Sequence, residues 1–337
     1  MEASSRYDAI VVGGGHNGLV ASAYLARAGL STLLIEARGD VGGTAASEPF
    51  AGVTVNICNC DHLTFRTTPV AEELDLTTHG LDYLDLDPGQ HNATWASVGD
   101  GVMWSSHRDV DAAADEIGRF SSADADAYRR FVADARPVVE LIFEAAAAPP
   151  GLSGLTKLAA RRRGRGLARL LAWSRRSAHD VLTSYFSTPE VAATGAVTGP
   201  MVWGISPRTP GTGLGAITHA MRHVATVGRP IGGSGRLTDT LRAVVEAAGG
   251  TVLTHTAVTE IRCDRHRVAG VTAVPCGADG AGAIETSATA ETMEFDAPIV
   301  VSACNPHDTF LRSRRSRWPR RRRRRRARRS RRRPDAG

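Results

Sequence analysis

The first forty residues change their hydrophobic periodicity three times. A run of apolar residues, Ala9–Val12, has the length of a buried strand and stops at three successive glycines. Apolar residues then recur at helical spacing over residues 19–26, and Gly29 ends that pattern. A second apolar run, Thr32–Ile35, ends at the acidic Glu36. The order of these patterns predicts a strand, a tight turn, a helix and a second strand, which together form a βαβ unit.

The glycines of this turn have the spacing that a dinucleotide requires. Gly13 permits the tight turn, Gly15 lets the backbone approach a pyrophosphate, and Gly18 allows close packing of helix and strand. The start of the helix offers free N–H groups and the positive end of its dipole to phosphate oxygens. Glu36 follows Gly13 by 23 residues, the place of an acid that binds a ribose hydroxyl, and its charge disfavours the 2′-phosphate of NADP. The alternative is a glycine-rich turn with an incidental acid, but the complete βαβ unit favours a dinucleotide site.

Residues 37–44, with the sequence ARGDVGGT, place an arginine and a glycine pair directly after the acid. Here the chain resembles the FAD-dependent oxidoreductases of the phytoene-dehydrogenase-like family, within the amine-oxidase and glutathione-reductase group of flavoproteins. The resemblance implies that the βαβ unit holds the ADP half of FAD and that the R-x-x-x-G-G segment lies along the nucleotide. The residues that it implies for FAD binding are Gly13, Gly14, Gly15, Gly18, Glu36, Ala37, Arg38, Gly42, Gly43, Thr44 and Val258.

The resemblance resumes over residues 199–261, where a second glycine-rich turn, Gly232–Gly235, opens an amphipathic helix. We expect a glycine pair at 249–250 to end this helix, and one or two strands to follow. The resemblance implies that Val258 lies against the adenine, and that Pro298–Ala303 is a buried strand returning to the cofactor domain. It covers about residues 6–311 of the chain.

The patterns predict an α/β fold. The resemblance implies that a FAD-binding, Rossmann-like domain of the glutathione-reductase type carries an inserted α+β substrate domain. The insertion includes a helical pattern over residues 110–147 and a basic amphipathic stretch over 158–176. That stretch is interpreted either as a solvated face or as a helix lying on a membrane surface. The predicted segments are the N-terminal part of the FAD-binding domain (1–90), the substrate domain (91–225), the return to the FAD-binding domain (226–311) and a disordered Arg-rich tail (312–337).

The net charge of +6 comes from the tail alone, because 16 of the 41 basic residues are arginines between 312 and 333. With Asp335 as the tail's single acid, the rest of the chain has 25 basic and 34 acidic residues, a net charge of −9. Three interpretations of the tail compete: an arm that binds nucleic acid or another anionic surface, a solvated terminus, or an out-of-frame translation of a GC-rich gene. We favour the last.

The frameshift interpretation has a consequence for function. The resemblance implies a second glycine-rich motif near the C-terminus of such proteins. In this chain the Arg-rich residues 312–337 stand where that motif is expected. The alternative function is therefore an inactive, C-terminally truncated fragment whose tail binds nucleic acid or anionic surfaces. A third hypothesis is a FAD- or NAD-binding module without oxidoreductase activity.

Composition predicts a cytoplasmic protein, with peripheral membrane contact as the alternative location. The chain has no run of 18 apolar residues, no secretory signal, and an odd number of cysteines, five. The group Cys58, Cys60, Asp61 and His62 imitates a metal cluster, but no second pair stands at ligand spacing, so no metal is predicted. The remaining cysteines at 263, 276 and 304 are interpreted as small core residues.

No catalytic side chain is predicted, since the resemblance implies that the flavin performs the hydride chemistry. His16 lies in the glycine turn and is a candidate for facing the flavin. His219 and His223 stand four residues apart, at the spacing of one helix face, and are interpreted as packing or solvent-facing residues. The expected reaction is two-electron dehydrogenation of a small apolar (carotenoid- or lipid-like) or amine substrate. The sequence predicts no nucleic-acid partner apart from the tail, and no oligomeric state.

Overall fold

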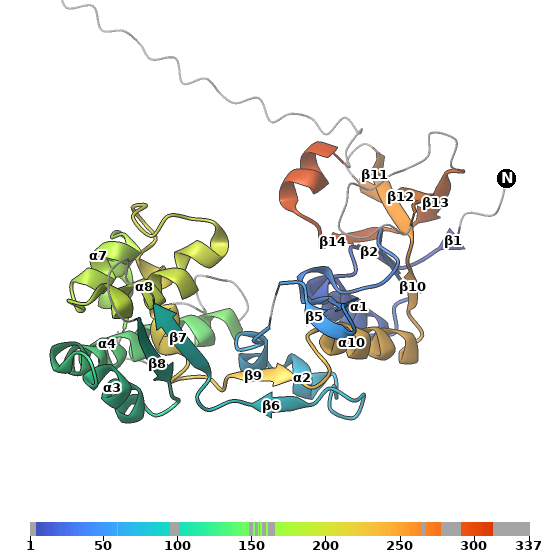
Figure 1. Cartoon of the computed structure of the whole chain (residues 1–337). Coiled ribbons are helices and arrows are strands. Elements are labelled where there is room, and N and C mark those ends of the chain that lie inside the picture. Colours follow the sequence, from blue (N-terminus) through green and yellow to red (C-terminus); the bar gives the residue numbers. More distant parts are fainter. Residues whose placement is uncertain are drawn as a thin grey trace, which may run out of the picture.

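The computed structural model describes residues 5–58, 60–94, 101–147, 151, 154, 156, 160, 166–264, 267–277 and 291–312. These residues form two units that lie side by side (Figure 1). The α/β unit contains the described residues before 83 and after 230, and the helical unit contains those between 86 and 227. The antiparallel pair β6 (Tyr83–Asp85) and β9 (Gly228–Pro230) joins the two units.

A parallel sheet forms the centre of the α/β unit. Its strand order is β10-β3-β2-β14, and every neighbouring pair is parallel. Both faces of this sheet are covered, which explains why its two middle strands are continuous apolar runs rather than alternating ones. The strands are β2 (Ala9–Val12), β3 (Thr32–Ile35), β10 (Thr251–Leu253) and β14 (Ile299–Ser302).

Successive side chains of the parallel sheet point to two different layers. Val11 and Leu34 pack with the helices α1 and α10 on one face. Ile10 and Ile35 pack on the other face against a second sheet, of order β1-β13-β12-β11. The helices are α1 (His16–Arg27) and α10 (Gly235–Ala247), and the strands of the second sheet are β1 (Ser5–Arg6), β11 (Thr256–Asp264), β12 (Arg267–Pro275) and β13 (Met293–Asp296).

The expectation that Pro298–Ala303 is a buried strand is wrong in one respect. β14 pairs in parallel with β2, from Ile299 opposite Ala9 to Ser302 opposite Val12. It nevertheless forms an edge of the sheet within the described part of the chain, and Ile299 is 44% exposed. A strand is buried only where a neighbour covers its outer side, and periodicity along the strand does not report that neighbour.

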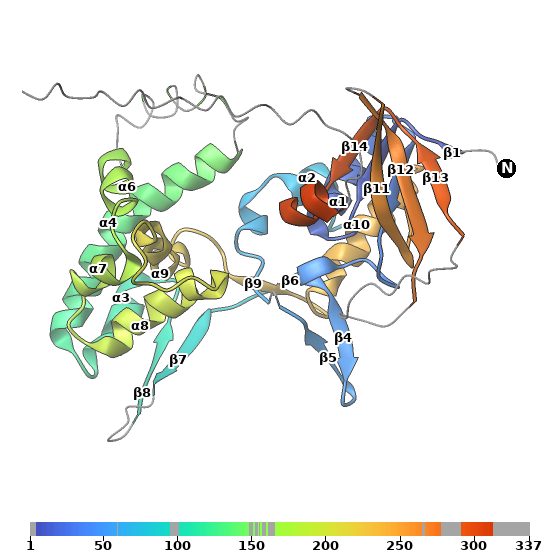
Figure 2. The same cartoon turned by 90° about the horizontal axis from the view of Figure 1, so that it is seen from above.

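Short elements complete the α/β unit. A 3-10 turn, η1, leads into the antiparallel hairpin of β4 and β5, which projects from the unit in Figure 2. The chain then passes through a second 3-10 turn and one short helix before it reaches β6. These elements are η1 (Gly43–Ala45), β4 (Ser47–Phe50), β5 (Val53–Asn56), η2 (Phe65–Thr67) and α2 (Val70–Glu73); a π-helical turn, η5 (Asp308–Arg312), follows β14.

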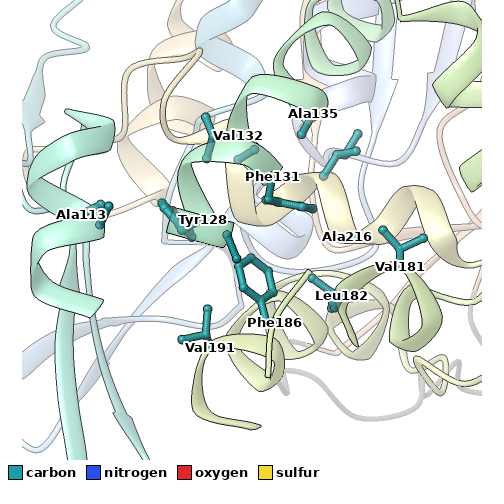
Figure 3. Packing of buried hydrophobic residues seen from close by; sticks show 14 of the residues in the cluster. Ala113, Tyr128, Phe131, Val132, Ala135, Val181, Leu182, Phe186, Val191 and Ala216 are labelled. Carbon is teal, nitrogen blue, oxygen red and sulfur yellow. The ribbon is translucent and has the colours of Figure 1, made fainter. Parts of the chain in front are cut away.

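The helical unit packs around the long helix α4. Its core is aromatic: Tyr128 and Phe131 from α4 meet Phe186 (Figure 3), and the rings of Phe131 and Trp173 stack with centroids 5.8 Å apart. The elements are β7 (Gln90–Thr94), β8 (Val102–Ser106), α3 (Val110–Gly118), α4 (Ser122–Ala147), α6 (Leu167–Trp173), α7 (Ala178–Thr183), α8 (Pro189–Thr198), η3 (Pro200–Trp203), η4 (Gly213–Ile217) and α9 (Thr218–Met221).

The helical pattern expected over residues 110–147 corresponds to the two helices α3 and α4. The side chain of Ser121 caps the second helix by accepting a hydrogen bond from the Asp124 N–H at 3.2 Å. The buried Asp124 carboxylate accepts hydrogen bonds from the backbone and side chains of Ser187 and Thr188. These four bonds tie α4 to the start of α8, and they hold the pKa of Asp124 below its usual value against the opposing effect of burial.

Two sequence expectations fall largely outside the described residues: the first part of the basic amphipathic stretch, at 158–159 and 161–165, and the tail from residue 313 onward. Within the described part of the chain, no helix is both long and apolar enough to cross a membrane.

Candidate dinucleotide-binding site

At Gly13 and Gly18 the glycine turn after β2 has no place for a side chain. The N–H of Gly13 donates to the carbonyl of Ile35 at 2.8 Å, and Gly13 has a φ of +102°, in the region that favours glycine. A Cβ on Gly18 would lie 1.9 Å from the carbonyl oxygen of Gly13. The turn and the first turn of α1 can therefore approach each other only because position 18 is glycine.

Gly15 differs from its neighbours because the space beside it is open. A Cβ there would meet only the Cα of Gly43, at 3.8 Å, and the backbone of Gly15 is extended (φ −71°, ψ 169°), a conformation open to any residue. Gly15 is the N-cap residue of α1, and no side chain caps this helix. The first amides of α1 are therefore available to an anion that approaches over Gly15.

Glu36 is fixed at the end of β3 by two backbone amides. The N–H of Gly14 donates to one carboxylate oxygen at 2.5 Å, and the N–H of Arg38 donates to the other at 2.9 Å. Each oxygen keeps a further lone pair for a donor such as a ribose hydroxyl. The carboxylate is thus oriented before any ligand arrives.

The glycine pair of the R-x-x-x-G-G segment lies across the first glycine turn. The N–H of Gly42 donates to the carbonyl of Gly14 at 2.9 Å, and a Cβ on Gly43 would lie 3.0 Å from the Cα of Gly15. Both residues have positive φ, +148° for Gly42 and +57° for Gly43. Thr44, in η1, is exposed at the outer side of this loop. The fold thereby brings together two glycine segments separated by more than 25 residues in the sequence.

The other residues that the resemblance implies lie beside Glu36, on the side of the sheet end away from the glycine pair, or next to it in the chain. Arg38 forms an ion pair with Glu48, and its carbonyl accepts the N–H of His255 at 2.9 Å. The Ala37 carbonyl accepts a hydrogen bond from the Cys276 thiol at 2.7 Å. Val258 packs against the cluster that contains Ile35. Sequence-distant segments around 36–38, 253–258 and 276 therefore form one wall.

Two thiols stand at the margins of this site. Cys276 lies on the wall that contains Ala37, and Cys304 lies at the end of β14, where a Cβ on Gly13 would come within 3.2 Å of its sulfur. Burial and the charge of Glu36 raise the pKa of both thiols. The expectation that Cys263, Cys276 and Cys304 are core residues is wrong, because the first two are half-buried and Cys304 as a whole residue is exposed, although its sulfur lies against the Val12 carbonyl.

The second glycine turn is filled by the protein's own side chains. Ser47 Oγ accepts the N–H of Gly235 at 2.9 Å, and Asn56 Oδ1 accepts the N–H of Ser234 at 2.8 Å. A Cβ on Gly233, where φ is +97°, would lie 2.8 Å from Ser47 Oγ. The hairpin β4–β5 thus caps the start of α10, and the N–H groups of Ser234 and Gly235 are hydrogen-bonded to its side chains.

Cys58, Cys60, Asp61 and His62, which resemble a metal cluster in the sequence, have different surroundings in the structure. Asp61 forms ion pairs with Arg222 at 3.2 Å and with Arg229 at 3.1 Å. His62 is 1% exposed, whereas Cys58 and Cys60 are exposed. No group of three metal-ligating side chains occurs among the residues that the structure describes.

The histidines considered as candidates have different surroundings. His16 is the first residue of α1 and is half-buried, and burial lowers its pKa. His219 and His223 are both buried beside Tyr128, but they do not share a helix, because α9 ends at Met221. His223 is hydrogen-bonded to Tyr128 Oη at 2.8 Å, and burial lowers the pKa of His219 to about 3. Of these three histidines, only His16 lies beside the first glycine turn.

Residues 11–73 match the family described as an NAD(P)-binding Rossmann-like domain. Over longer stretches the chain is 29% identical to one of the subunits of limonene dehydrogenase from Castellaniella defragrans, covering 90% of this chain and 52% of the relative. It is 27% identical to the lycopene-forming phytoene desaturase of Pseudescherichia vulneris, covering 78% and 51%. The chain spans about half the length of the curated relatives it matches.

Solved structures give the same fold. A variant of putrescine oxidase with redesigned cofactor binding matches with a TM-score of 0.58 and 19% identity, over 92% of this chain and 60% of that one. The family match over residues 11–73 and the structural similarity together show a Rossmann-like fold for the α/β unit. The predicted resemblance to oxidoreductases of the phytoene-dehydrogenase-like type is confirmed, because the similar proteins include a phytoene desaturase and a limonene dehydrogenase subunit.

Proposed function

We propose that this chain is the cofactor-binding part of a FAD-dependent oxidoreductase. The observation that carries the proposal is the open space over Gly15, flanked by the uncapped start of α1 and by the oriented carboxylate of Glu36. A pyrophosphate fits the first feature, because it is an anion that needs backbone amides. A ribose fits the second, since its hydroxyls can donate to the carboxylate.

The residues around this space match the ADP half of FAD. The amides after Gly15 would bind the pyrophosphate, Glu36 would bind the ribose, and Val258 would pack against the adenine. The segment from Arg38 to Thr44 would lie along the nucleotide, with Gly42 and Gly43 leaving room for it. Once bound, FAD would supply the hydride acceptor for a two-electron oxidation. The carboxylate of Glu36 disfavours a 2′-phosphate and therefore NADP as the ligand.

An apolar substrate fits the helical unit better than an amine does. The end of α8 and the segment that follows it expose several large apolar side chains, and Trp203 is 76% exposed. Exposed apolar patches of this kind mark binding surfaces for ligands or partners. Such a surface desolvates hydrocarbon but offers no partner to an ammonium group. Its members are Val197, Met201, Val202, Trp203 and Ile205.

The protein would work in a reducing compartment such as the cytoplasm. All five cysteines are free thiols. Contact with a membrane surface would give access to a hydrocarbon substrate, and it belongs to the same proposal.

The test is titration of the purified chain with FAD, followed by flavin fluorescence, with ADP as the competitor. We expect saturable binding that ADP displaces and that NADP does not. Anaerobic addition of terpenoid or carotenoid hydrocarbons should then bleach the flavin absorbance, and primary amines should not. Folded protein that binds neither FAD nor ADP would refute the cofactor assignment, and bleaching by amines alone would refute the substrate class.

A substitution of the exposed Trp203 tests the substrate step separately from cofactor binding. A W203A variant removes a side chain that lies mostly in solvent, so its melting temperature and FAD affinity should equal those of the wild type. Its rate of bleaching at low hydrocarbon concentration should fall. An unchanged rate would place the substrate elsewhere.

A further inference from the structure

His62 connects three segments that are remote in the sequence. It is 1% exposed, and both of its ring nitrogens have partners: Nδ1 is hydrogen-bonded to Tyr83 Oη at 2.9 Å, and Nε2 to Ser234 Oγ at 3.2 Å. Tyr83 belongs to β6, which joins the two units, and the buried Ser234 is the N-cap residue of α10. A buried polar side chain with both nitrogens bonded has one orientation, so His62 fixes the distance between these elements.

The same chain of bonds continues to the loop that carries the glycine pair. The N–H of Ser234 donates to Asn56 Oδ1 at 2.8 Å, and Ser47 Oγ donates to the same oxygen at 2.8 Å. Ser47 is the first residue of β4 and follows directly on the loop in which Gly43 packs over Gly15. Helix α10 also contacts η1, the turn that contains Gly43. A displacement of Ser234 is therefore passed to Gly43 through two hydrogen-bonded side chains.

The network also lies close to the phosphate-binding end of α1. Burial is the main cause that lowers the pKa of His62, to about 4, and the charge of His16 lowers it further. His62 is therefore neutral at pH 7 and can both donate and accept a hydrogen bond. The guanidinium of Arg66 lies 4.6 Å from the centroid of the Tyr83 ring and pairs with Asp85 at 2.6 Å, which holds the Tyr83 end in place.

We propose that Tyr83, His62 and Ser234 are positioning residues for the dinucleotide: their hydrogen bonds hold the glycine-pair loop at the distance from Gly15 that a bound pyrophosphate requires. None of the three belongs to the residues that surround the open space over Gly15. The inference rests on the proposed function, because it assigns these residues to the same cofactor site.

The experiment compares two Tyr→Phe variants that each remove a Tyr–His hydrogen bond; Y128F also removes a longer bond of 3.4 Å from Tyr128 Oη to the His219 carbonyl. Y83F removes the bond to His62, and the control Y128F removes the bond of 2.8 Å to His223 in the helical unit. Binding of ADP is measured by calorimetry at a temperature where both variants are folded, and thermal unfolding is recorded in parallel. We expect Y83F to weaken ADP binding by about three- to tenfold, the equivalent of one hydrogen bond. We expect Y128F to bind ADP as the wild type does.

Two further variants separate positioning from a general loss of structure. S234A keeps the backbone bond to Asn56 but loses the bond to His62, so it should weaken ADP binding as much as Y83F does. The double variant Y83F/S234A should weaken binding by less than the product of the two single effects, because both act through one ring. H62Q, which keeps a donor and an acceptor, should retain more affinity than H62F.

The outcomes distinguish this inference from the proposal on which it rests. If the wild type binds neither ADP nor FAD, the proposed function fails and the inference fails with it. If the wild type binds ADP and Y83F and S234A bind it equally well, the inference alone is wrong. It is also wrong if Y128F loses as much affinity as Y83F, since the effect would then follow stability rather than position.

Discussion

Two glycine-rich turns open two helices on the same face of one sheet, and the structure uses them in opposite ways. The turn before α1 leaves open space beside Gly15 and no side-chain cap on the helix. Ser47 and Asn56 fill the turn before α10, and their side chains accept hydrogen bonds from the backbone N–H groups at the start of that helix. A glycine-rich turn is therefore not by itself a ligand site. What decides its role is whether the protein or a ligand occupies the space that the absent side chains leave.

The largest effect should come from a methyl group in the open space. We expect G15A to weaken FAD and ADP binding on the order of 100-fold, because the backbone can no longer approach the pyrophosphate. Its thermal stability should stay unchanged or rise slightly, because the extended backbone of Gly15 accepts alanine without strain. Calorimetric titration and a melting curve measure the two quantities.

A methyl group elsewhere provides the control for G15A. In G118A, at the end of α3, the added Cβ meets only Ala125, at an ordinary 3.7 Å. This variant should bind the dinucleotide as the wild type does. If G15A also binds normally, the space over Gly15 is not the pyrophosphate site, and the two turns do not differ in the way described.

The same substitution in the filled turn should act on stability. G233A would force alanine to a φ of +97° and place its Cβ 2.8 Å from Ser47 Oγ. We expect the free energy of unfolding to fall by about 1–3 kcal/mol from backbone strain and overpacking. Urea unfolding followed by circular dichroism measures this loss. A G233A variant as stable as the wild type would mean that the turn is looser than its hydrogen bonds indicate.

The open turn could be predicted from the sequence because its signals are local. The strand, the turn, the helix and the second strand occupy fewer than thirty consecutive residues, and each has its own periodicity. The acid at position 36 closes the pattern at the distance that a ribose requires. Local order of this kind follows from side-chain patterning and from the steric needs of glycine, without knowledge of the rest of the chain.

The filled turn could not be predicted in the same way. Ser47 and Asn56 accept hydrogen bonds from backbone amides that lie 188 and 178 residues away in the sequence. No periodicity links positions so far apart. The same limit explains the exposed edge of β14 and the buried histidines near α9. In each case the surroundings of a residue depend on a tertiary neighbour rather than on its own segment.

Acid should weaken the filled turn through His62. Burial lowers the pKa of His62 to about 4, whereas an unfolded chain has a histidine pKa near 6.5. Between these values the unfolded state binds a proton that the native state does not, so stability falls as the pH is lowered from about 6.5 to about 4, by up to about 1.4 kcal/mol per pH unit. The free energy of unfolding, measured across this range, gives the slope.

The contribution of His62 can be separated from that of the other buried histidines. H62F removes the titrating group, so its stability should depend less steeply on pH than that of the wild type. His219, whose pKa is lowered to about 3, continues to titrate in both proteins and adds the same slope to each. Equal slopes for H62F and the wild type would show that His62 is not held in a neutral, buried state.

The smallest effect should come from the side chain that caps α10. S47A removes the acceptor of the Gly235 N–H and the donor to Asn56, so the free energy of unfolding should fall by about 1 kcal/mol. S47T keeps the hydroxyl and should recover most of that loss. If S47A leaves stability unchanged and S47T lowers it, the space before α10 is limited by volume rather than by hydrogen bonding. In that case hydrogen bonds from Ser47 would not distinguish the two turns. They would differ only in packing: side chains fill the space before α10, whereas the space before α1 is open.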